Sequence, residues 1–214
     1  MQGASFDKRL VRRLAVYHGA NSPIETSAAS GLKMAYPKLP EWPIVDPENP
    51  PKGYLKVTEM RDPEVPDSVW HIFISGRHLV IVSRDWIQLD ESDPGEYVAE
   101  QYEYPIAAAS WFVATLGRFF LEPDHPNAVP RGAITIEEEV DGEMLGVTRG
   151  AQYGSMLKGI PGYSLDNLNR FSHTSIHVST NWCQMFKMGD PWLFEQGLLD
   201  VFKDIADRHE KGEF

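Results

Sequence analysis

Residues 133–149 read AITIEEEVDGEMLGVTR, and this stretch determines the class of fold that we expect. β-Branched and apolar residues alternate with polar ones on both sides of Asp141-Gly142, a pair that supplies the positive φ angles of a type I′ turn. The stretch therefore predicts a hairpin of two strands, residues 133–139 and 143–149. Residues 69–75 and 78–83 flank Gly76-Arg77 in the same way and predict a second hairpin, and residues 54–60 alternate as a further strand.

Two segments predict helices that pack against these hairpins. Residues 106–121 are apolar on nearly all sides, and Pro105 is expected at the first helical position. A last helix is expected from Asp190, its N-cap, through Pro191 to about Arg208. Apolar residues recur there at helical spacing and form one core-facing stripe, made of Phe194, Leu198, Val201, Phe202 and Ile205. The expected fold class is α+β, with antiparallel hairpins and packed helices.

A short internal repeat divides the chain. VSRDWIQL at residues 82–89 returns as VSTNWCQM at residues 178–185. In each copy an apolar strand reaches a serine, Ser83 or Ser179, whose hydroxyl is able to cap a following helix. We therefore expect one globular domain over residues 1–214 with two related halves, about 54–104 and 133–210, each containing a strand, a serine cap and a helix.

A proline-rich segment precedes the first half and is expected as an arm over residues 37–66. Proline fixes φ and removes a backbone donor, so the arm should run extended over the surface. Leu39, Trp42 and Ile44 provide it with apolar side chains to bury. A packed arm is therefore favoured over a ligand for a proline-recognition module. Its prolines are Pro37, Pro40, Pro43, Pro47, Pro50 and Pro51.

Composition narrows the class of function. The chain has 214 residues, 20 Lys+Arg against 31 Asp+Glu, and a formal net charge of -11. This balance argues against nucleic acid and against anionic membranes as partners, because both bind through Lys and Arg. Cys183 is the single cysteine, which excludes an internal disulfide and a zinc site built from several thiolates. No apolar run approaches the length of a membrane span. We expect a cytoplasmic protein without metal or cofactor.

The acidic side chains are concentrated in the last two thirds of the chain. Residues 1–61 hold nine basic and six acidic side chains, whereas residues 62–214 hold eleven and twenty-five. Two acidic tracts, one interleaved with tyrosines, are expected to bind a protein with a basic surface. The alternative is that both are merely solvated faces. The candidate contact residues are Asp93, Glu96, Tyr97, Glu100, Tyr102 and Glu103 in the first tract, and Glu137, Glu138, Glu139, Asp141 and Glu143 in the hairpin.

The repeated Val82-Ser83 and Val178-Ser179 corners carry a resemblance to a known class of proteins. Together with the segment DPGEYVAEQYEY at residues 93–104 and the arm around Leu39-Pro40, they resemble immunity proteins of bacterial polymorphic-toxin systems. The resemblance covers roughly residues 37–105 and 165–200, and it lies in the style of the motifs. It implies a cytoplasmic protein that binds and neutralises a cognate toxin and has no catalytic residues.

A catalytic alternative rests on two histidines. His173 and His177 each begin a His-x-Ser pattern, as in phosphoesterases that use two such motifs. On a strand the two residues would lie about 13 Å apart, too far to share one metal or phosphate. On a helix they would be neighbours. A small hydrolase or phosphoesterase using His173 or His177 is therefore the second hypothesis. A phage or mobile-element inhibitor of a host enzyme is the third.

Overall fold

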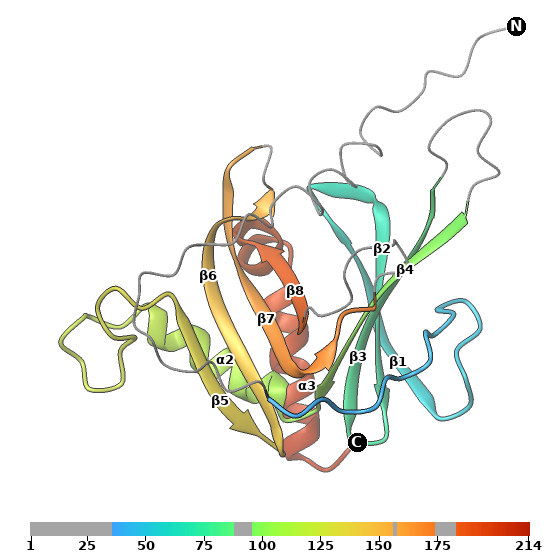
Figure 1. Cartoon of the computed structure of the whole chain (residues 1–214), viewed down its shortest axis with the longest axis horizontal. Coiled ribbons are helices and arrows are strands. Elements are labelled where there is room, and N and C mark those ends of the chain that lie inside the picture. Colours follow the sequence, from blue (N-terminus) through green and yellow to red (C-terminus); the bar gives the residue numbers. More distant parts are fainter. Residues whose placement is uncertain (1–35, 88–95, 156–157, 174–182) are drawn as a thin grey trace, which may run out of the picture.

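The computed structural model describes residues 36–87, 96–155, 158–173 and 183–214, and these residues form two four-stranded antiparallel sheets. Neighbouring strands are consecutive in sequence, so each sheet is a meander (Figure 1). The N-terminal sheet contains β1 (Tyr54–Asp62), β2 (Val65–Ser75), β3 (His78–Ile87) and β4 (Glu96–Pro105). The C-terminal sheet contains β5 (Thr135–Val140), β6 (Glu143–Ser155), β7 (Ile160–Phe171) and β8 (Cys183–Gly189).

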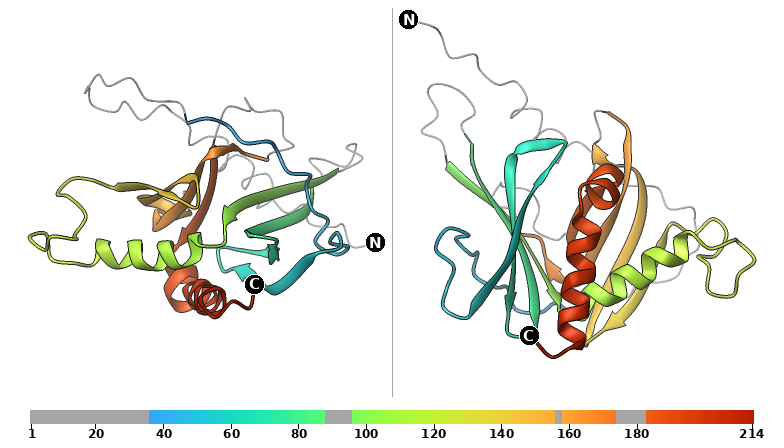
Figure 2. Two further views of the ribbon diagram at one scale, coloured as in Figure 1. Left: turned by 90° about the horizontal axis from the view of Figure 1, so that it is seen from below. Right: turned by 180° about the vertical axis from the view of Figure 1, so that it is seen from behind.

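Each sheet is followed in the chain by a helix. α2 (Ala108–Phe119) follows the N-terminal sheet, and a short π-helix, η1 (Pro191–Glu195), leads into α3 (Leu198–Glu210) after the C-terminal sheet. Figure 2 shows α2 and α3 crossing behind the C-terminal sheet, with α3 beside the N-terminal sheet. The rings of Phe112 and Phe202 mark this crossing, because their centroids are 4.8 Å apart.

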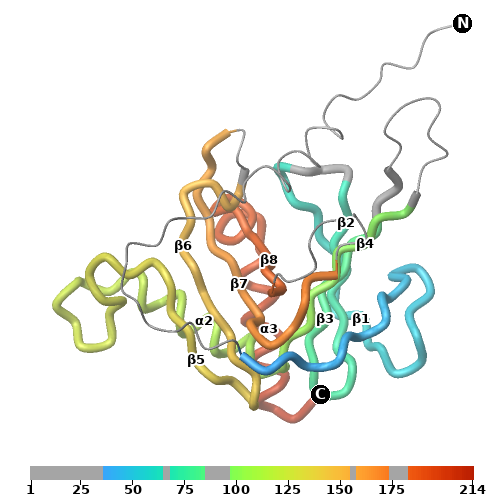
Figure 3. Tube along the Cα trace, viewed as in Figure 1, coloured from blue at the N-terminus to red at the C-terminus, as the bar shows by residue number. Residues whose placement is uncertain are grey.

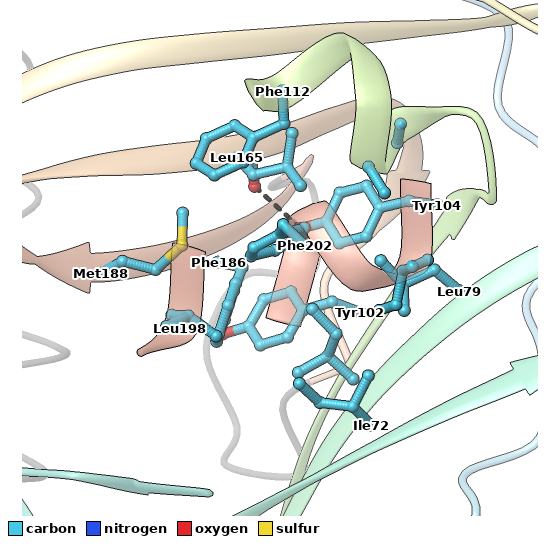
Figure 4. Packing of buried hydrophobic residues seen from close by; sticks show 14 of the residues in the cluster. Ile72, Leu79, Tyr102, Tyr104, Phe112, Leu165, Phe186, Met188, Leu198 and Phe202 are labelled. Atoms are coloured by element: carbon cyan, nitrogen blue, oxygen red, sulfur yellow. Dashed lines mark hydrogen bonds between the residues drawn. The ribbon is translucent and has the colours of Figure 1, made fainter. Parts of the chain in front are cut away.

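A large hydrophobic core lies between the two sheets and the helices. Ile72 and Tyr104 come from the N-terminal sheet, Leu165 from the C-terminal sheet, and Phe112 and Phe202 from the helices; each is at most 2% exposed. The Tyr104 hydroxyl donates a hydrogen bond of 2.8 Å to the backbone carbonyl of Leu165 (Figure 4). Burial of these large apolar side chains, at roughly 1.5–3 kcal/mol each, holds the two sheets together.

The α+β class and both predicted hairpins are confirmed. Ser75 pairs with His78 across the turn of the first hairpin, and Val140 pairs with Glu143 across the second. The second turn has positive φ angles at both central residues, 48° at Asp141 and 84° at Gly142. These are the angles that a two-residue turn of type I′ requires.

For the first copy of the repeat, the prediction of a strand, a serine cap and a helix is wrong. Ser83 lies inside β3, where it pairs with Trp70 on one side and Glu100 on the other. The strand continues to Ile87 because β4 supplies hydrogen-bonding partners for its backbone, so no helix N-terminus needs a cap. The Ser83 hydroxyl is buried without a hydrogen-bond partner among the described residues.

The second copy of the repeat is described only in part. Ser179 lies outside the described residues, and residues 183–185, where the sequence predicted a helix, belong to β8. The boundaries of the two other helices also differ from expectation. Pro105 ends β4, and α2 begins at Ala108. The last helix is interrupted at Gly197, whose φ of 85° ends η1 before α3 begins.

This interruption divides the predicted apolar stripe. Leu198, Phe202 and Ile205 are buried on α3 as expected, whereas Phe194 on η1 is 41% exposed. Phe194 precedes the left-handed residue, so it does not continue the α3 face. Its ring instead meets the exposed ring of Phe120 at 5.9 Å.

The proline-rich arm packs over the surface without helix or strand from residue 36 to residue 50. The Leu39 amide donates to the carbonyl of Asn169 on β7 (2.8 Å), and the Val45 amide donates to Oε1 of Gln101 on β4 (2.7 Å). The arm therefore runs from the C-terminal sheet to the N-terminal sheet (Figure 3). Residues 54–62 form β1, as the alternation of residues 54–60 predicted, so the arm without regular structure ends before residue 54 and not at residue 66.

The sequence predicted that Ile44 of the arm is buried, but the buried residue is its neighbour Val45. Ile44 is 48% exposed, whereas its neighbour Val45 is 2% exposed. Trp42 packs against a small second hydrophobic cluster, Phe73 and two valines, on the outer face of the N-terminal sheet. The arm thus covers an apolar patch that the two sheets leave outside the main core.

Candidate functional site

The first acidic tract is only partly available for contact with a partner. Asp93 lies outside the described residues, as does the side chain of Glu96. Tyr97 is 56% exposed, and the Arg84 guanidinium lies 4.1 Å above its ring. Glu100 is half-buried.

Two predicted contact residues of this tract are buried, which corrects the sequence prediction. Tyr102 is 8% exposed within the main core, and Glu103 is 1% exposed. They face opposite sides of β4, and each side is covered by another part of the chain. Neither side chain therefore lies on an exposed contact surface.

The hairpin of β5 and β6 keeps most of its acidic side chains on the surface. Glu137 and Glu139 are exposed on the outer face of the C-terminal sheet, and Asp141 in the turn pairs with Arg77 at 3.1 Å. Glu138 points to the opposite face, toward α2, where it accepts hydrogen bonds from Trp111 (2.8 Å) and Arg118 (2.5 Å). These donors lower the pKa of Glu138, with the Trp111 hydrogen bond as the largest cause.

β5 is also a free edge of the C-terminal sheet as far as the described strands extend. Val140 and Glu143 flank the two-residue turn and form a hydrogen-bonded pair, so hydrogen-bonded and non-bonded positions alternate from there. Glu137 and Glu139 occupy non-bonded positions, which point their backbone N–H and C=O groups away from β6. The same two residues thus present both charge and backbone groups at the edge.

The last residue of the predicted hairpin set, Glu143, is buried, which is a second correction. It is 5% exposed, and its carboxylate accepts two hydrogen bonds from Arg170 at 2.7 and 2.9 Å. His78 Nε2 lies 3.0 Å away, and Asn167 donates at 2.6 Å. Burial by itself would raise the pKa of Glu143, but these partners outweigh it and lower the pKa to about 2.

Glu103 is the centre of a second buried polar group. Gln101 donates to its carboxylate at 2.6 Å, His173 Nε2 lies 2.8 Å from it, and Gln184 of β8 donates to the other oxygen. Burial acts to raise the pKa of Glu103, and the hydrogen bonds from His173 and Gln184 outweigh it and lower the pKa. The Asn167 amide also donates to the Glu103 backbone carbonyl at 2.8 Å.

These two groups form one buried polar junction between the sheets, where β4 meets β7 and β8. The arm covers it from outside: the Trp42 ring lies 4.9 Å from that of His78 and 5.4 Å from the Arg170 guanidinium. Every carboxylate oxygen of Glu103 and Glu143 has a partner, so the junction acts as a structural connection. Sequence reasoning did not find Arg170, Gln101 or Gln184, because alternation shows which face a residue occupies and not what covers that face.

The histidine hypothesis receives a partial test. His173 lies just after β7 with its side chain 7% exposed against Glu103, while His177 lies outside the described residues. Among the residues that the structure describes, no three His, Cys, Asp or Glu side chains are grouped to hold a metal ion. No helix in this part of the chain is long and apolar enough to cross a membrane.

Comparisons with known proteins identify no relative: no protein-family model matches the chain, and no curated protein or solved structure matches it.

Proposed function

We propose that this protein is a toxin-neutralising immunity protein, which acts in the cytoplasm by binding a cognate bacterial toxin and occluding its functional surface. The observation that carries the proposal is the acidic free edge of β5. Glu137 and Glu139 are exposed there with their backbone groups directed outward, and Asp141 continues the acidic surface into the turn. A basic partner surface is complementary to this edge in charge.

The electrostatics support an inhibitor that associates rapidly. A formal net charge of -11 attracts a basic partner from a distance, and the exposed carboxylates fix its orientation at contact. Tyr102, Glu103 and Glu143 are buried and are therefore removed from the proposed contact surface, and Glu138 is removed because it faces α2. The revised set is Tyr97, Glu100, Glu137, Glu139 and Asp141 among the residues whose side chains are described. Binding then requires no chemistry by this chain.

The test uses the protein encoded by the neighbouring reading frame as the partner. The variant Glu137→Lys with Glu139→Lys should weaken binding by at least about tenfold, mainly through a slower association rate. The matched control, Asp207→Lys with Glu210→Lys at exposed positions of α3, changes the net charge by the same amount outside the β5 edge. Equal affinities of the two variants would refute the role of the edge, and absence of binding by the unmodified protein would refute the proposed function.

A second candidate function, a small hydrolase or phosphoesterase, is favoured by one observation. The Glu103 carboxylate lies 2.8 Å from His173 Nε2, and a carboxylate that orients an imidazole is a common arrangement for a general base. Turnover of a chromogenic phosphoester or ester tests it. Loss of that turnover in His173→Gln and His177→Gln, with unchanged circular dichroism, would support the enzyme; absence of turnover in the unmodified protein would remove it.

A further inference from the structure

Two exposed phenylalanines contact each other where the end of α2 meets η1. Phe120 is 66% exposed, its ring centroid lies 5.9 Å from that of Phe194, and the Phe194 ring lies 6.1 Å from that of Tyr163 on β7. Ile134 is 57% exposed and lies on the same face as Tyr163, because its carbonyl accepts the amide of Arg149, which pairs directly with Tyr163. We call these three exposed residues the phenylalanine patch (Phe120, Phe194 and Ile134).

Both phenylalanines of the patch are held by hydrogen-bonded backbone. The Phe120 amide donates to the Gly117 carbonyl at 3.1 Å at the end of α2. Phe194 belongs to η1, which is closed by the Gln196 amide donating to the Pro191 carbonyl at 3.0 Å. A π-helical turn of this kind is rare and is often found at functional sites. Contiguous exposed apolar side chains, unlike singly scattered ones, mark interaction sites, so the patch is a candidate docking surface.

The charge beside the patch is negative. Glu122 follows Phe120 by two residues, and Glu195 is the neighbour of Phe194 in the chain. Both glutamates are exposed and form no ion pair with another described residue. The arginines on the segments that carry the patch are each paired with an acid: Arg118 with Glu138, Arg131 with Asp124, and Arg149 with Asp190. The patch is therefore complementary to a segment that combines apolar and basic side chains.

Residues 6–17 of the same chain have this composition. They read FDKRLVRRLAVY, with four basic residues and one acidic residue among apolar ones, and they lie outside the described residues. Residues 1–35 hold five basic and two acidic side chains, whereas residues 36–214 hold fifteen and twenty-nine. Opposite charge therefore attracts residues 6–17 to the rest of the chain.

The described part of the chain begins close to the patch. The Tyr36 hydroxyl donates to Glu137 at 3.1 Å, and Glu137 is three residues from Ile134, about 10 Å along the strand direction. Residues 18–35 connect residue 17 to this point, and a flexible chain of about 20 residues has an average end-to-end distance of about 25 Å. Residues 6–17 are therefore able to reach the patch, and the connection raises their effective concentration there to roughly the millimolar range.

We propose that residues 6–17 bind the phenylalanine patch of the same chain, with their apolar side chains on the two phenyl rings and their basic side chains beside Glu122 and Glu195. This contact is formed within one chain and is independent of the proposed function. Burial of the exposed rings and attraction between opposite charges both favour it. A second copy of the chain is the less favourable occupant, because two patches brought together would place Glu122 and Glu195 of both copies side by side.

The test measures proximity by NMR in the full chain. A nitroxide spin label is attached to Ser5→Cys in a Cys183→Ser background, which leaves one thiol for labelling. The amide signals of the three patch residues should lose at least about half of their intensity relative to the same protein with reduced label. The reason is that a segment at roughly millimolar effective concentration is bound for much of the time.

Two pairs of variants assign the contact to the patch. Phe120→Ser with Phe194→Ser should restore the Ile134 signal, whereas Leu55→Ser, which removes an apolar side chain of comparable exposure (49%) from β1, should not.

The second pair tests the charge. Glu122→Gln with Glu195→Gln should reduce the broadening of the Ile134 signal, whereas Asp207→Asn with Glu210→Gln on α3 removes the same charge and should leave it unchanged. The glutamate variant alters exposed carboxylates only, so it keeps the test decisive if the phenylalanine variant fails to fold. Circular dichroism of each variant checks the fold.

Three results would overturn the proposal. The first is full signal intensity at the patch in the spin-labelled protein, and the second is broadening that both the phenylalanine and the glutamate variants leave in place. The third is broadening in a mixture of spin-labelled copies and separate isotope-labelled copies, which would show that the contact joins two chains. None of these results decides whether the protein binds a toxin, because that binding is measured with the partner protein.

Discussion

Removing Arg170 should destabilise the protein strongly, because the Glu143 carboxylate would remain buried without its positively charged partner. Arg170 and Glu143 have side chains only 6% and 7% exposed, and the guanidinium donates to both carboxylate oxygens. Arg170→Met keeps much of the side-chain volume and leaves Glu143 with His78 and Asn167 as partners. Breaking one side of a buried pair costs about 3–5 kcal/mol of the free energy of unfolding.

The pKa of Glu143 gives a second route to the same magnitude. It falls from its ordinary value of 4.5 to about 2, and each unit corresponds to 1.36 kcal/mol, so the folded environment favours the ionised form by about 3 kcal/mol. Because the pKa is lowered on folding, this stability is present above about pH 5 and is lost as the pH falls toward about 2. The two magnitudes agree.

The assay is urea unfolding at about pH 7 and about pH 3 for the unmodified protein, Arg170→Met, and the double variant Glu143→Met with Arg170→Met. The single variant should lose most at the higher pH. The double variant should recover much of that loss, because no buried charge remains unpaired. A loss below about 1 kcal/mol in Arg170→Met, or equal losses at both pH values, would refute the reasoning.

Three further predictions concern packing, an inter-sheet hydrogen bond and a buried acid. Gly162→Ala should destabilise the protein by about 1–3 kcal/mol or more, because the added methyl group would lie 2.1 Å from the backbone oxygen of Met188. Gly117→Ala in α2 is the matched control: its methyl group meets nothing within 4 Å, and it should stabilise the protein by about 0.5–1 kcal/mol. The urea midpoints of the two variants test this difference. Tyr104→Phe removes the hydrogen bond between the sheets and should cost about 1 kcal/mol in the same measurement, and a value near zero would contradict that role. Folding raises the pKa of Asp166 from 3.8 to about 7. Its contribution to the free energy of unfolding is therefore complete below about pH 4 and is lost as the pH rises through about 7, a decline of at most about 4 kcal/mol. Thermal unfolding at several pH values should show this decline in the unmodified protein and not in Asp166→Asn.

The local sequence was sufficient to predict the elements that are determined by φ preferences and by alternation over a few neighbouring residues. Asp141-Gly142 specifies a tight turn through its own φ preferences, and alternation in residues 133–149 places Glu138 opposite to Glu137 and Glu139, as the structure shows. The same local reasoning failed at Ser83. A serine after an apolar strand caps a helix only if the chain leaves the sheet there, and β4 keeps residues 84–87 in the sheet by pairing with them.

For the candidate site, too, some residues were predicted correctly from the sequence and others were not. The acidic tracts were visible in the sequence, and Glu137, Glu139 and Asp141 are exposed as a contact surface requires. Tyr102 and Glu103 belong to an equally acidic tract and are buried. The sequence around Glu103 does not show that it is buried, because two of its partners, His173 and Gln184, lie far along the chain, Gln184 being 81 residues away.

By itself, the sequence determined the α+β class, the antiparallel hairpins with their turns, the approximate positions of two helices, and the concentration of acidic charge after residue 61. Those properties depend on φ preferences and periodicity over a few neighbouring residues. Only the tertiary structure decided which carboxylates are buried and paired, and that β5 is left as an acidic edge among the described strands. The physical reason is that burial and charge pairing depend on which distant strands and arm residues come together, and a side chain's own neighbours in sequence do not carry that information.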